Sequence, residues 1–364
     1  MKRRVLNIGV SGLNATDNPG PGVAVIRSIR ESGEFGGIIT GLAYNPLDPG
    51  AHMRGICDNV FLMPYPSQGA ENLLERIRAI HSMLPLDVII PTLDSELSLY
   101  LKIDRELASM GIHTYLPEEE MFNLRSKARF HGLRDMGVNV PKGKPVSDAS
   151  AVYGLEKEYT FPVMVKGQFY EAFIAYSPME AVSLFFRLSS KWGLPVVIQE
   201  FIPGTEYDVV ALGDGKGGLV GAVPMKKMQL TDQGKAWGGI TIADDGMNEF
   251  VRSVMGKLKW RGPCEFEVMK ARHSGEYYLI EVNPRFPAWC YLAVGAGQNL
   301  AWAAVRLALG EEVPPFSTYQ VGTLFLRHSV EHIYPLSQYR HLTTEGQLVR
   351  IVDEEGTKRR HGKA

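Results

Sequence analysis

Short apolar runs alternate with amphipathic stretches over the first third of the chain. Runs rich in β-branched and large apolar residues at 4–10, 37–44 and 87–93 predict buried strands. The segments at about 23–31 and 71–84 predict helices, the second from apolar residues at helical spacing. Strands and helices that alternate in this way predict a parallel, doubly wound α/β sheet, in which ligands bind beyond the carboxyl ends of the strands.

A Gly/Asn/Pro-rich loop follows the first predicted strand and raises the question of a dinucleotide site. Its glycines and Gly9 do not reproduce the GxGxxG spacing, and no acidic residue ends the second strand. A Rossmann dinucleotide site requires both the GxGxxG spacing and the acidic residue. The sequence therefore disfavours such a cofactor.

A second pattern predicts a β-hairpin in the last third of the chain. Strands at 264–271 and 277–283 flank a turn signal that contains Gly275. Pro284 ends the second strand, and Arg285 follows it. A guanidinium at this strand end suits a phosphate or a carboxylate.

The same hairpin predicts a metal site. Side chains alternate along a strand, so Glu281 and Asn283 share one face. With the turn centred near His273, Glu265 lies opposite Glu281, and two carboxylates that close repel each other unless a cation lies between them. Hard oxygen ligands suit Mg²⁺. The alternative is a pair of solvated glutamates on an exposed sheet face.

Lysines in two places indicate an anionic ligand. Lys166 ends an apolar strand at 158–168, and a partly buried ammonium requires an anion. Lys226, Lys227 and Lys235 flank a glycine-containing loop, which either supplies charge to phosphate or is a plain solvated loop.

Farther along the chain, we expect one Ala-rich helix at 292–309 and a strand at 319–329, to which no role is assigned.

Composition and charge narrow the class of protein. The chain has 364 residues, of which 45% are hydrophobic and 22% are charged, so it is long enough for two or three domains. A formal net charge of -1 gives no electrostatic case for nucleic acid or an anionic membrane. The three cysteines lack zinc spacing and suit a reducing compartment. No membrane span or leader is evident, so a cytoplasmic protein is expected.

Several of these motifs together resemble one family. IEVNPR at 280–285, EFEV at 265–268 and VIQEFIPGTE at 197–206, preceded by Lys127 and Lys166, are similar to motifs of the ATP-grasp superfamily. The similarity spans about half of the chain and is greatest to the carbamoyl-phosphate synthase and biotin carboxylase-like branch, and to the related carboxylate–amine ligases.

The resemblance implies a role for each motif. Glu265, Glu281 and Asn283 would bind Mg²⁺ or Mn²⁺, with Arg285 and Lys235 as catalytic cations. Lys127 and Lys166 would contact the phosphates of ATP. The adenine would be read by the backbone of the hinge, and Glu206 would bind ribose. The residues of the hinge are Gln199, Glu200, Phe201 and Ile202.

The resemblance also implies a domain organisation. It comprises an amino-terminal α/β domain (1–115) that helps to hold the acid or acceptor, a small lid subdomain with a linker helix (116–203), a large subdomain with the metal site (204–315), and a strand and solvated tail (316–364). Substrate contacts are expected from 14–22, from Asp94–Glu96 and from residues after Arg285. One departure stands out, because the loop after Lys166 is not glycine-rich and its cover of the γ-phosphate is in question.

The implied activity is an ADP-forming ligation. A small carboxylate would be activated as an acyl phosphate and attacked by an amine, and no side-chain nucleophile is required. Two alternatives stay open: bicarbonate activation, as in carboxylases, and an ATP-binding protein without catalysis. The former lacks support from a biotin-carrier lysine motif or a second copy of the domain. A homodimer is expected only because dimers are common in the resembling family.

Overall fold

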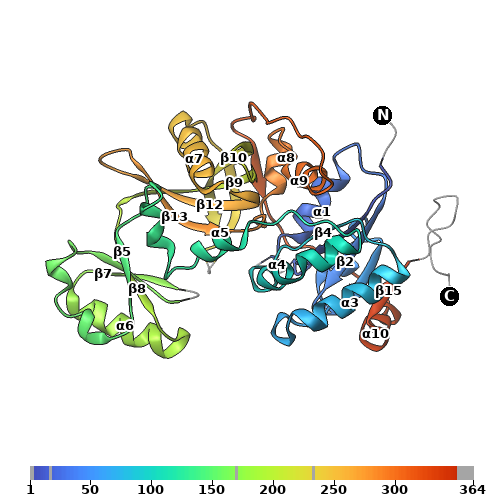
Figure 1. Cartoon of the computed structure of the whole chain (residues 1–364), viewed down its shortest axis with the longest axis horizontal. Coiled ribbons are helices and arrows are strands. Elements are labelled where there is room, and N and C mark those ends of the chain that lie inside the picture. Colours follow the sequence, from blue (N-terminus) through green and yellow to red (C-terminus); the bar gives the residue numbers. More distant parts are fainter. Residues whose placement is uncertain (1–3, 16–18, 169–170, 232–233, 351–364) are drawn as a thin grey trace.

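The computed structural model describes residues 4–15, 19–168, 171–231 and 234–350, which form three sheets with flanking helices (Figure 1). The predicted tail from Asp353 and parts of the loops at 14–22 and 231–239 lie outside the described residues. Among the described helices, none is both long enough and apolar enough to cross a membrane.

The amino-terminal part is built on a five-stranded sheet of order β15-β3-β2-β1-β4, in which β1 to β4 run parallel. This confirms the predicted doubly wound α/β sheet, since the apolar runs form its strands and amphipathic helices cover its faces. Its strands up to β4 are β1 (Asn7–Ser11), β2 (Ile38–Ala43), β3 (Asn59–Leu62) and β4 (Val88–Ile90). Its helices are α1 (Gly22–Arg30), α2 (Pro49–His52), the 3-10 turn η1 (Pro66–Gln68), α3 (Ala70–Met83) and α4 (Asp94–Ser109).

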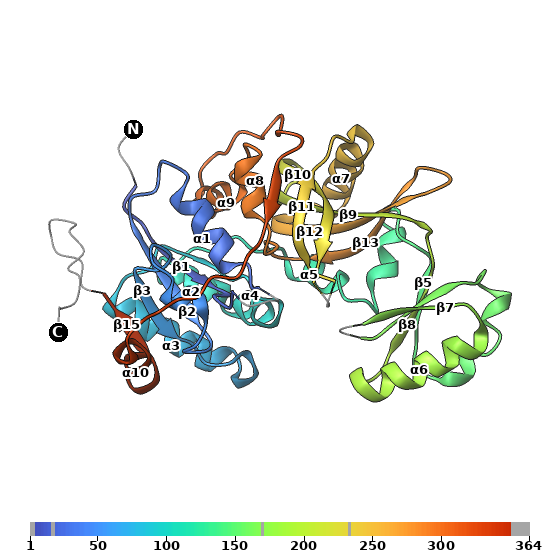
Figure 2. The ribbon, with the colours of Figure 1, turned by 180° about the vertical axis from the view of Figure 1, so that it is seen from behind.

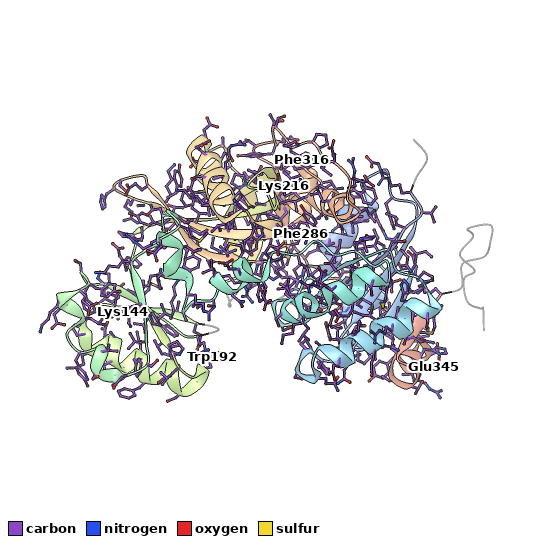
Figure 3. All side chains as sticks on the ribbon, in the orientation of Figure 1. Lys144, Trp192, Lys216, Phe286, Phe316 and Glu345 are labelled. Atoms are coloured by element: carbon purple, nitrogen blue, oxygen red, sulfur yellow. The ribbon has the colours of Figure 1, made fainter. Side chains whose placement is uncertain are left out.

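A connector leads to a small four-stranded sheet, which lies apart from the other two sheets at the lower left of Figure 1. Lys144 and Trp192 mark this part in Figure 3. The connector holds α5 (Glu119–Leu124) and η2 (Phe130–Arg134). The small sheet has the order β5-β8-β6-β7 and comprises β5 (Gly143–Val146), η3 (Ala149–Ala151), η4 (Leu155–Lys157), β6 (Val163–Lys166), β7 (Ala172–Ala175), α6 (Pro178–Trp192) and β8 (Val196–Glu200).

The third sheet has six strands in the order β13-β12-β9-β10-β11-β14. Helix α7 packs on one face, and α8, α9 and the amino-terminal part cover the other, where Phe286 belongs to a core shared by both larger sheets (Figure 3). The elements are β9 (Gly204–Asp214), β10 (Leu219–Leu230), β11 (Ala236–Thr241), α7 (Asp245–Leu258), β12 (Arg261–Ala271), β13 (Tyr277–Asn283), α8 (Tyr291–Gly295), α9 (Leu300–Ala308) and β14 (Leu324–Leu326).

The single helix expected at 292–309 is wrong, because the chain forms α8 and α9 with a break between them. Gly297 adopts a φ of 92°, a left-handed conformation that ends a helix, and the Asn299 side chain then accepts a hydrogen bond from the Trp302 N–H at 3.1 Å. A glycine stop followed by an asparagine cap separates the two helices.

The carboxyl-terminal segment returns to the first sheet. After β14, the chain crosses to α10 (Leu336–Glu345) and β15 (Gln347–Val349), which pairs antiparallel with β3 (Figure 2). Arg76 Nη2 donates to the Gly346 carbonyl at 2.7 Å, which anchors this return on α3. Residues 316–350, for which no role was predicted, therefore contribute β14 to the six-stranded sheet and β15 to the five-stranded sheet.

Candidate active site

The pairing of β12 with β13 differs from the predicted one. Glu265 lies opposite Asn283, and Glu267 lies opposite Glu281. The turn lies slightly later than His273, and an irregularity between Glu267 and Val268 shifts the register further. The predicted pair of Glu265 and Glu281 is therefore wrong. Glu267 occupies the opposing position, and its i, i+2 spacing from Glu265 was a signal that could have identified it.

Glu265 instead lies in a hydrogen-bonded corner. Its Oε1 accepts from Trp289 Nε1 at 2.6 Å, and its Oε2 accepts from Asn283 Nδ2 at 3.2 Å. Arg285 Nη1 approaches the same Oε2 at 3.8 Å. These contacts suit a carboxylate that orients the Asn283 amide and the Arg285 guanidinium.

The Glu267 and Glu281 pair has the electrostatics of a cation site. Desolvation, and next the charge of Glu281, raise the pKa of Glu267 to about 8. Within the part of the chain that the structure describes, no group of three His, Cys, Asp or Glu side chains is placed to hold a metal. Two carboxylates with the Asn283 oxygen nevertheless fit Mg²⁺, which proteins commonly hold through one or two carboxylates together with substrate phosphates.

This pKa predicts how stability depends on pH. Glu267 binds its proton more tightly in the folded protein, with a pKa of about 8, than in the unfolded chain, where its ordinary value is 4.5. Its stabilising contribution is therefore complete below that ordinary value and is lost as the pH rises through the folded value. We expect the melting temperature of metal-free protein to fall as the pH rises from the ordinary value of 4.5 to about 8. Glu267→Gln should flatten that fall. A Glu267→Gln protein with the wild-type pH profile would contradict the assignment.

Lys166, the last residue of β6, lies within range of the charges of Glu267 and Glu281. The small sheet therefore contributes to the same group of charges as the β12–β13 hairpin. Burial lowers the pKa of the Lys166 ammonium, and the nearby charges of Glu281, Glu267 and Glu206 act in the opposite direction. Lys127, just after α5, lowers it further. The structure thus gathers five predicted or newly found site residues from the connector, the small sheet and the six-stranded sheet.

The predicted hinge residues connect the small sheet to the six-stranded sheet. Gln199 is buried in β8, Glu200 is exposed, and Phe201 and Ile202 are half-buried between β8 and β9. The Glu200 N–H donates to the Lys142 carbonyl at 2.7 Å, which ties the end of β8 to the segment before β5.

Two other residues predicted for the site lie near the hairpin of β10 and β11, called the β10–β11 arm below. Glu206 is exposed on β9 and accepts from Lys227 Nζ at 2.7 Å. Lys235 is exposed just before β11, beside 232–233, which the structure does not describe. Its backbone N–H donates to Thr231 Oγ1 at 3.1 Å.

Arg285 bridges the hairpin and the amino-terminal part. Its Nε donates to Asp94 Oδ2 at 2.8 Å. Burial lowers the pKa of Arg285, but Asp94 and Glu265 outweigh that effect, so its pKa is raised. Arg285 is thus a cation throughout the ordinary pH range, held between two carboxylates.

Of the strand end at 94–96, Asp94 faces Arg285 and Glu96 does not. Glu96 is fully buried, and it accepts from the hydroxyls of Ser11 and Tyr44 and from the N–H groups of Thr92 and Leu93. Its interactions cap the start of α4. A substrate contact expected at Glu96 is therefore corrected, because its acceptor capacity is used inside the fold.

Three charged residues near the site were not predicted from the sequence. Arg125 lies close enough to Asp94 and Glu281 for their charges to act on its pKa, which burial lowers. Arg327, after β14, donates from Nη1 to the Ala236 carbonyl at 2.6 Å and feels the charge of Glu265. Asp208 on β9 is buried beside Lys227, with Oδ2 and Nζ 3.1 Å apart. Only the fold brings these distant positions together.

Comparison with known proteins shows to which fold this geometry belongs. A family model described as "ATP-grasp in the biosynthetic pathway with Ter operon" matches residues 194–325, which include the hinge and the β12–β13 hairpin. The chain has the ATP-grasp fold. The superfamily predicted from the motifs is thereby supported, together with its carbamoyl-phosphate synthase and biotin carboxylase-like branch.

Individual relatives agree with the ATP-grasp fold. The crystal structure of biotin carboxylase from Campylobacter jejuni matches with a TM-score of 0.68 and 17% identity, covering 87% of this chain and 74% of that chain. Phosphoribosylamine–glycine ligase from Synechocystis sp. is 25% identical over 214 residues, which are 52% of this chain and 51% of the relative. The N-terminal section of the carbamoyl phosphate synthase large chain from Methanopyrus kandleri is 24% identical over 294 residues, 74% of this chain and 50% of the relative. The chain spans about half the length of these two curated relatives.

Proposed function

We propose that this ATP-grasp protein is an ADP-forming ligase that activates a small carboxylate as an acyl phosphate and joins it to an amine. One observation carries the proposal: Lys166 of the small sheet shares a charge group with the Glu267 and Glu281 pair of the large sheet. A buried ammonium on which the charges of two carboxylates from another sheet act is an arrangement suited to a metal–polyphosphate complex.

In this proposal, Glu267, Glu281 and Asn283 hold Mg²⁺ or Mn²⁺. The metal would neutralise charge on the phosphates when it is bound. Glu265 orients the Asn283 amide through the 3.2 Å hydrogen bond, so it acts behind the ligands rather than among them. Such supporting contacts fix the direction of metal ligands.

The nucleotide is proposed to lie between the small and large sheets. Lys127 and Lys166 would contact its phosphates, and Lys235 would add charge from the β10–β11 arm. The hinge backbone would read adenine, with the Glu200 carbonyl as acceptor and the Ile202 N–H as donor. Glu206, oriented by Lys227, would bind ribose.

Arg285 is proposed to stabilise the negative charge of the acyl phosphate and of the adduct that the amine forms with it. Asp94 holds its Nε at 2.8 Å, and a guanidinium fixed in advance costs little reorganisation when the charge develops. The small-molecule acid and amine would bind near this contact between the amino-terminal part and the hairpin, and a homodimer remains part of the proposal.

The test is ADP release from Mg-ATP with pooled small carboxylic acids and amino acids, with hydroxylamine as a trap. A hydroxamate formed with one acid pool would support acyl-phosphate chemistry and begin to identify the acid. ADP release with bicarbonate alone would favour the carboxylase alternative. Measurable ATP binding without ADP release in any pool would favour a binding protein.

Replacing Lys166 by Ala should weaken ATP binding, because a buried cation that faces phosphate is lost. A charge-assisted contact contributes about 1.5–3 kcal/mol, so an increase in the Kd for ATP of about 10- to 100-fold is expected. Lys144 is a matched control, since it lies on β5 of the same small sheet and pairs with exposed Glu158 at 2.6 Å. Equal ATP affinities of Lys166→Ala and Lys144→Ala, measured by calorimetry, would remove Lys166 from the site.

A further inference from the structure

Arg125, directly after α5, is a cation to which the fold gives no anionic partner. It is half-buried, and its side chain forms no hydrogen bond or ion pair with any residue that the structure describes. Its Nε is shielded from solvent, and its Cζ lies 4.4 Å from the centre of the Phe122 ring. An arginine cannot lose its charge near neutral pH, and a ring face offsets only part of the cost of burying it. The position therefore favours an anionic ligand.

The surroundings of Arg125 place it beside the reaction corner. Helix α5 lies between α4 and the six-stranded sheet (Figures 1 and 2). Arg125 lines a cavity of about 10 Å³ together with Val282, which follows Glu281 in β13. It also lies within range of the charges of Asp94 and Arg285, which pair with each other at 2.8 Å. Arg125 thus stands next to that ion pair and takes no part in it.

The charges around Arg125 differ from those around Lys166. Burial lowers the pKa of Arg125, and the charges of Asp94 and then of Glu281 act in the opposite direction. The charge of Glu281 also acts on Lys166, but there it is joined by the charge of Glu206, the residue proposed to bind ribose. Arg125 therefore lies toward the side of Glu281 where the acid is proposed to bind, and Lys166 lies toward the nucleotide.

The chemistry of a guanidinium selects between the two substrates of the proposed ligation. An arginine has only donors and a positive charge, so it offers nothing to the N–H groups of an amine and repels an ammonium. A carboxylate instead accepts two parallel N–H bonds from one guanidinium. The Nε of Arg285 is engaged by Asp94, whereas the fork of Arg125 is free of such contacts.

We propose that Arg125 is a substrate-binding residue that holds the reacting carboxylate of the acid together with Arg285. Arg125 sets the affinity for the acid, while Arg285 acts where charge develops. The inference rests on the proposed function, because it requires that a carboxylic acid binds next to the Glu267 and Glu281 pair.

Two other roles of Arg125 predict different results. An arginine that supports the fold lowers the melting temperature of the ligand-free protein when it is replaced. An arginine that contacts the γ-phosphate weakens the binding of ATP. A residue that binds the acid leaves both of these unchanged and alters only the dependence on the acid.

The test uses the full-length protein, with the pooled small carboxylic acids and amino acids as the probe. Arg125→Gln should raise the pool concentration that gives half-maximal ADP release by about 10- to 100-fold, the loss expected for one charge-assisted contact. The Kd for ATP, measured by calorimetry, should change by less than about twofold. The melting temperature of the ligand-free protein should not fall, because an unpaired charge is removed.

Arg125→Lys is a second variant, should the Gln variant not fold. It keeps the charge and loses the planar fork, so the same shift in acid dependence is expected with a smaller size. Arg129→Gln is the matched control, since Arg129 is an exposed arginine of the same connector. Its dependence on the acid pool should stay at the wild-type value.

The outcomes separate this inference from the proposed function. Wild-type acid dependence in a folded Arg125→Gln protein would overturn the inference and leave the function standing. A Kd for ATP that rises as much as the acid requirement would overturn it in favour of a phosphate contact, and a lowered melting temperature with unchanged acid dependence would favour a structural role. Absence of ADP release from the wild-type protein with every acid pool would overturn both.

Discussion

Glu281→Gln should fold like the wild-type protein and lower ADP formation on the order of 10³-fold, the upper range for the loss of one preorganised electrostatic group. Glu281 lies opposite Glu267 and contributes to the charge around Lys166. An amide keeps the shape of the side chain but removes the charge that a divalent metal requires. The same change should relieve repulsion within the pair, so the thermal stability of the metal-free protein should not fall.

Steady-state ADP release and a thermal melt with and without Mg²⁺ measure both effects. Glu276→Gln is the matched control, since Glu276 is an exposed residue of the same hairpin whose Oε2 accepts from the Tyr278 hydroxyl at 3.1 Å. It should retain wild-type turnover. ADP release from Glu281→Gln at the rate of the Glu276→Gln control would contradict the assignment of Glu281 to the metal.

Arg285→Lys should lower kcat by about 100-fold or more while the KM for ATP changes little. Lysine preserves the positive charge between Asp94 and Glu265, so the fold should tolerate it. It cannot reproduce the planar fork by which arginine holds one carboxylate through Nε while its remaining N–H groups face a second anion. The loss should therefore be confined to a step in which charge develops, at the cost expected for one such donor.

Rapid-quench measurement of the first turnover would isolate that step from product release. Arg272→Lys is the control, because Arg272 is exposed in the turn of the same hairpin. Its backbone N–H donates to the Pro203 carbonyl at 2.8 Å, and this bond does not depend on the side chain. A similar increase in the KM for ATP and decrease in kcat for Arg285→Lys would point to nucleotide binding instead. Unchanged kinetics would exclude Arg285 from the reaction.

Local patterns predict much of this fold because they act over a few residues. The apolar runs that became β1, β2 and β4 need no partner to be recognised, since burial on both faces requires continuous apolar sequence. The end of β13 at Asn283 follows from Pro284, which lacks the N–H that a strand uses. The break between α8 and α9 had a local signal in Gly297 and Asn299, which was outweighed by the surrounding Ala-rich pattern.

The register of the β12–β13 hairpin cannot be predicted from such local patterns. A hairpin turn that moves by one residue changes every cross-strand partner, and the irregularity after Glu267 has no clear mark in the sequence. That is why the face of Glu281 and Asn283 was predictable, while the residue opposite Glu281 was not.

By itself, the sequence determined the types of element, the superfamily motifs and the chemical character of the site: oxygen ligands at the end of a strand, an arginine beside them and a buried lysine on a separate strand. Tertiary structure alone decided which of these residues meet. Arg285 reaches Asp94, the charge of Glu281 acts on the pKa of Lys166, and Asp208 lies opposite Glu267 only because three sheets bring distant segments together. The physical reason is range: secondary structure follows from neighbours in the chain, whereas charge, burial and metal affinity depend on neighbours in space.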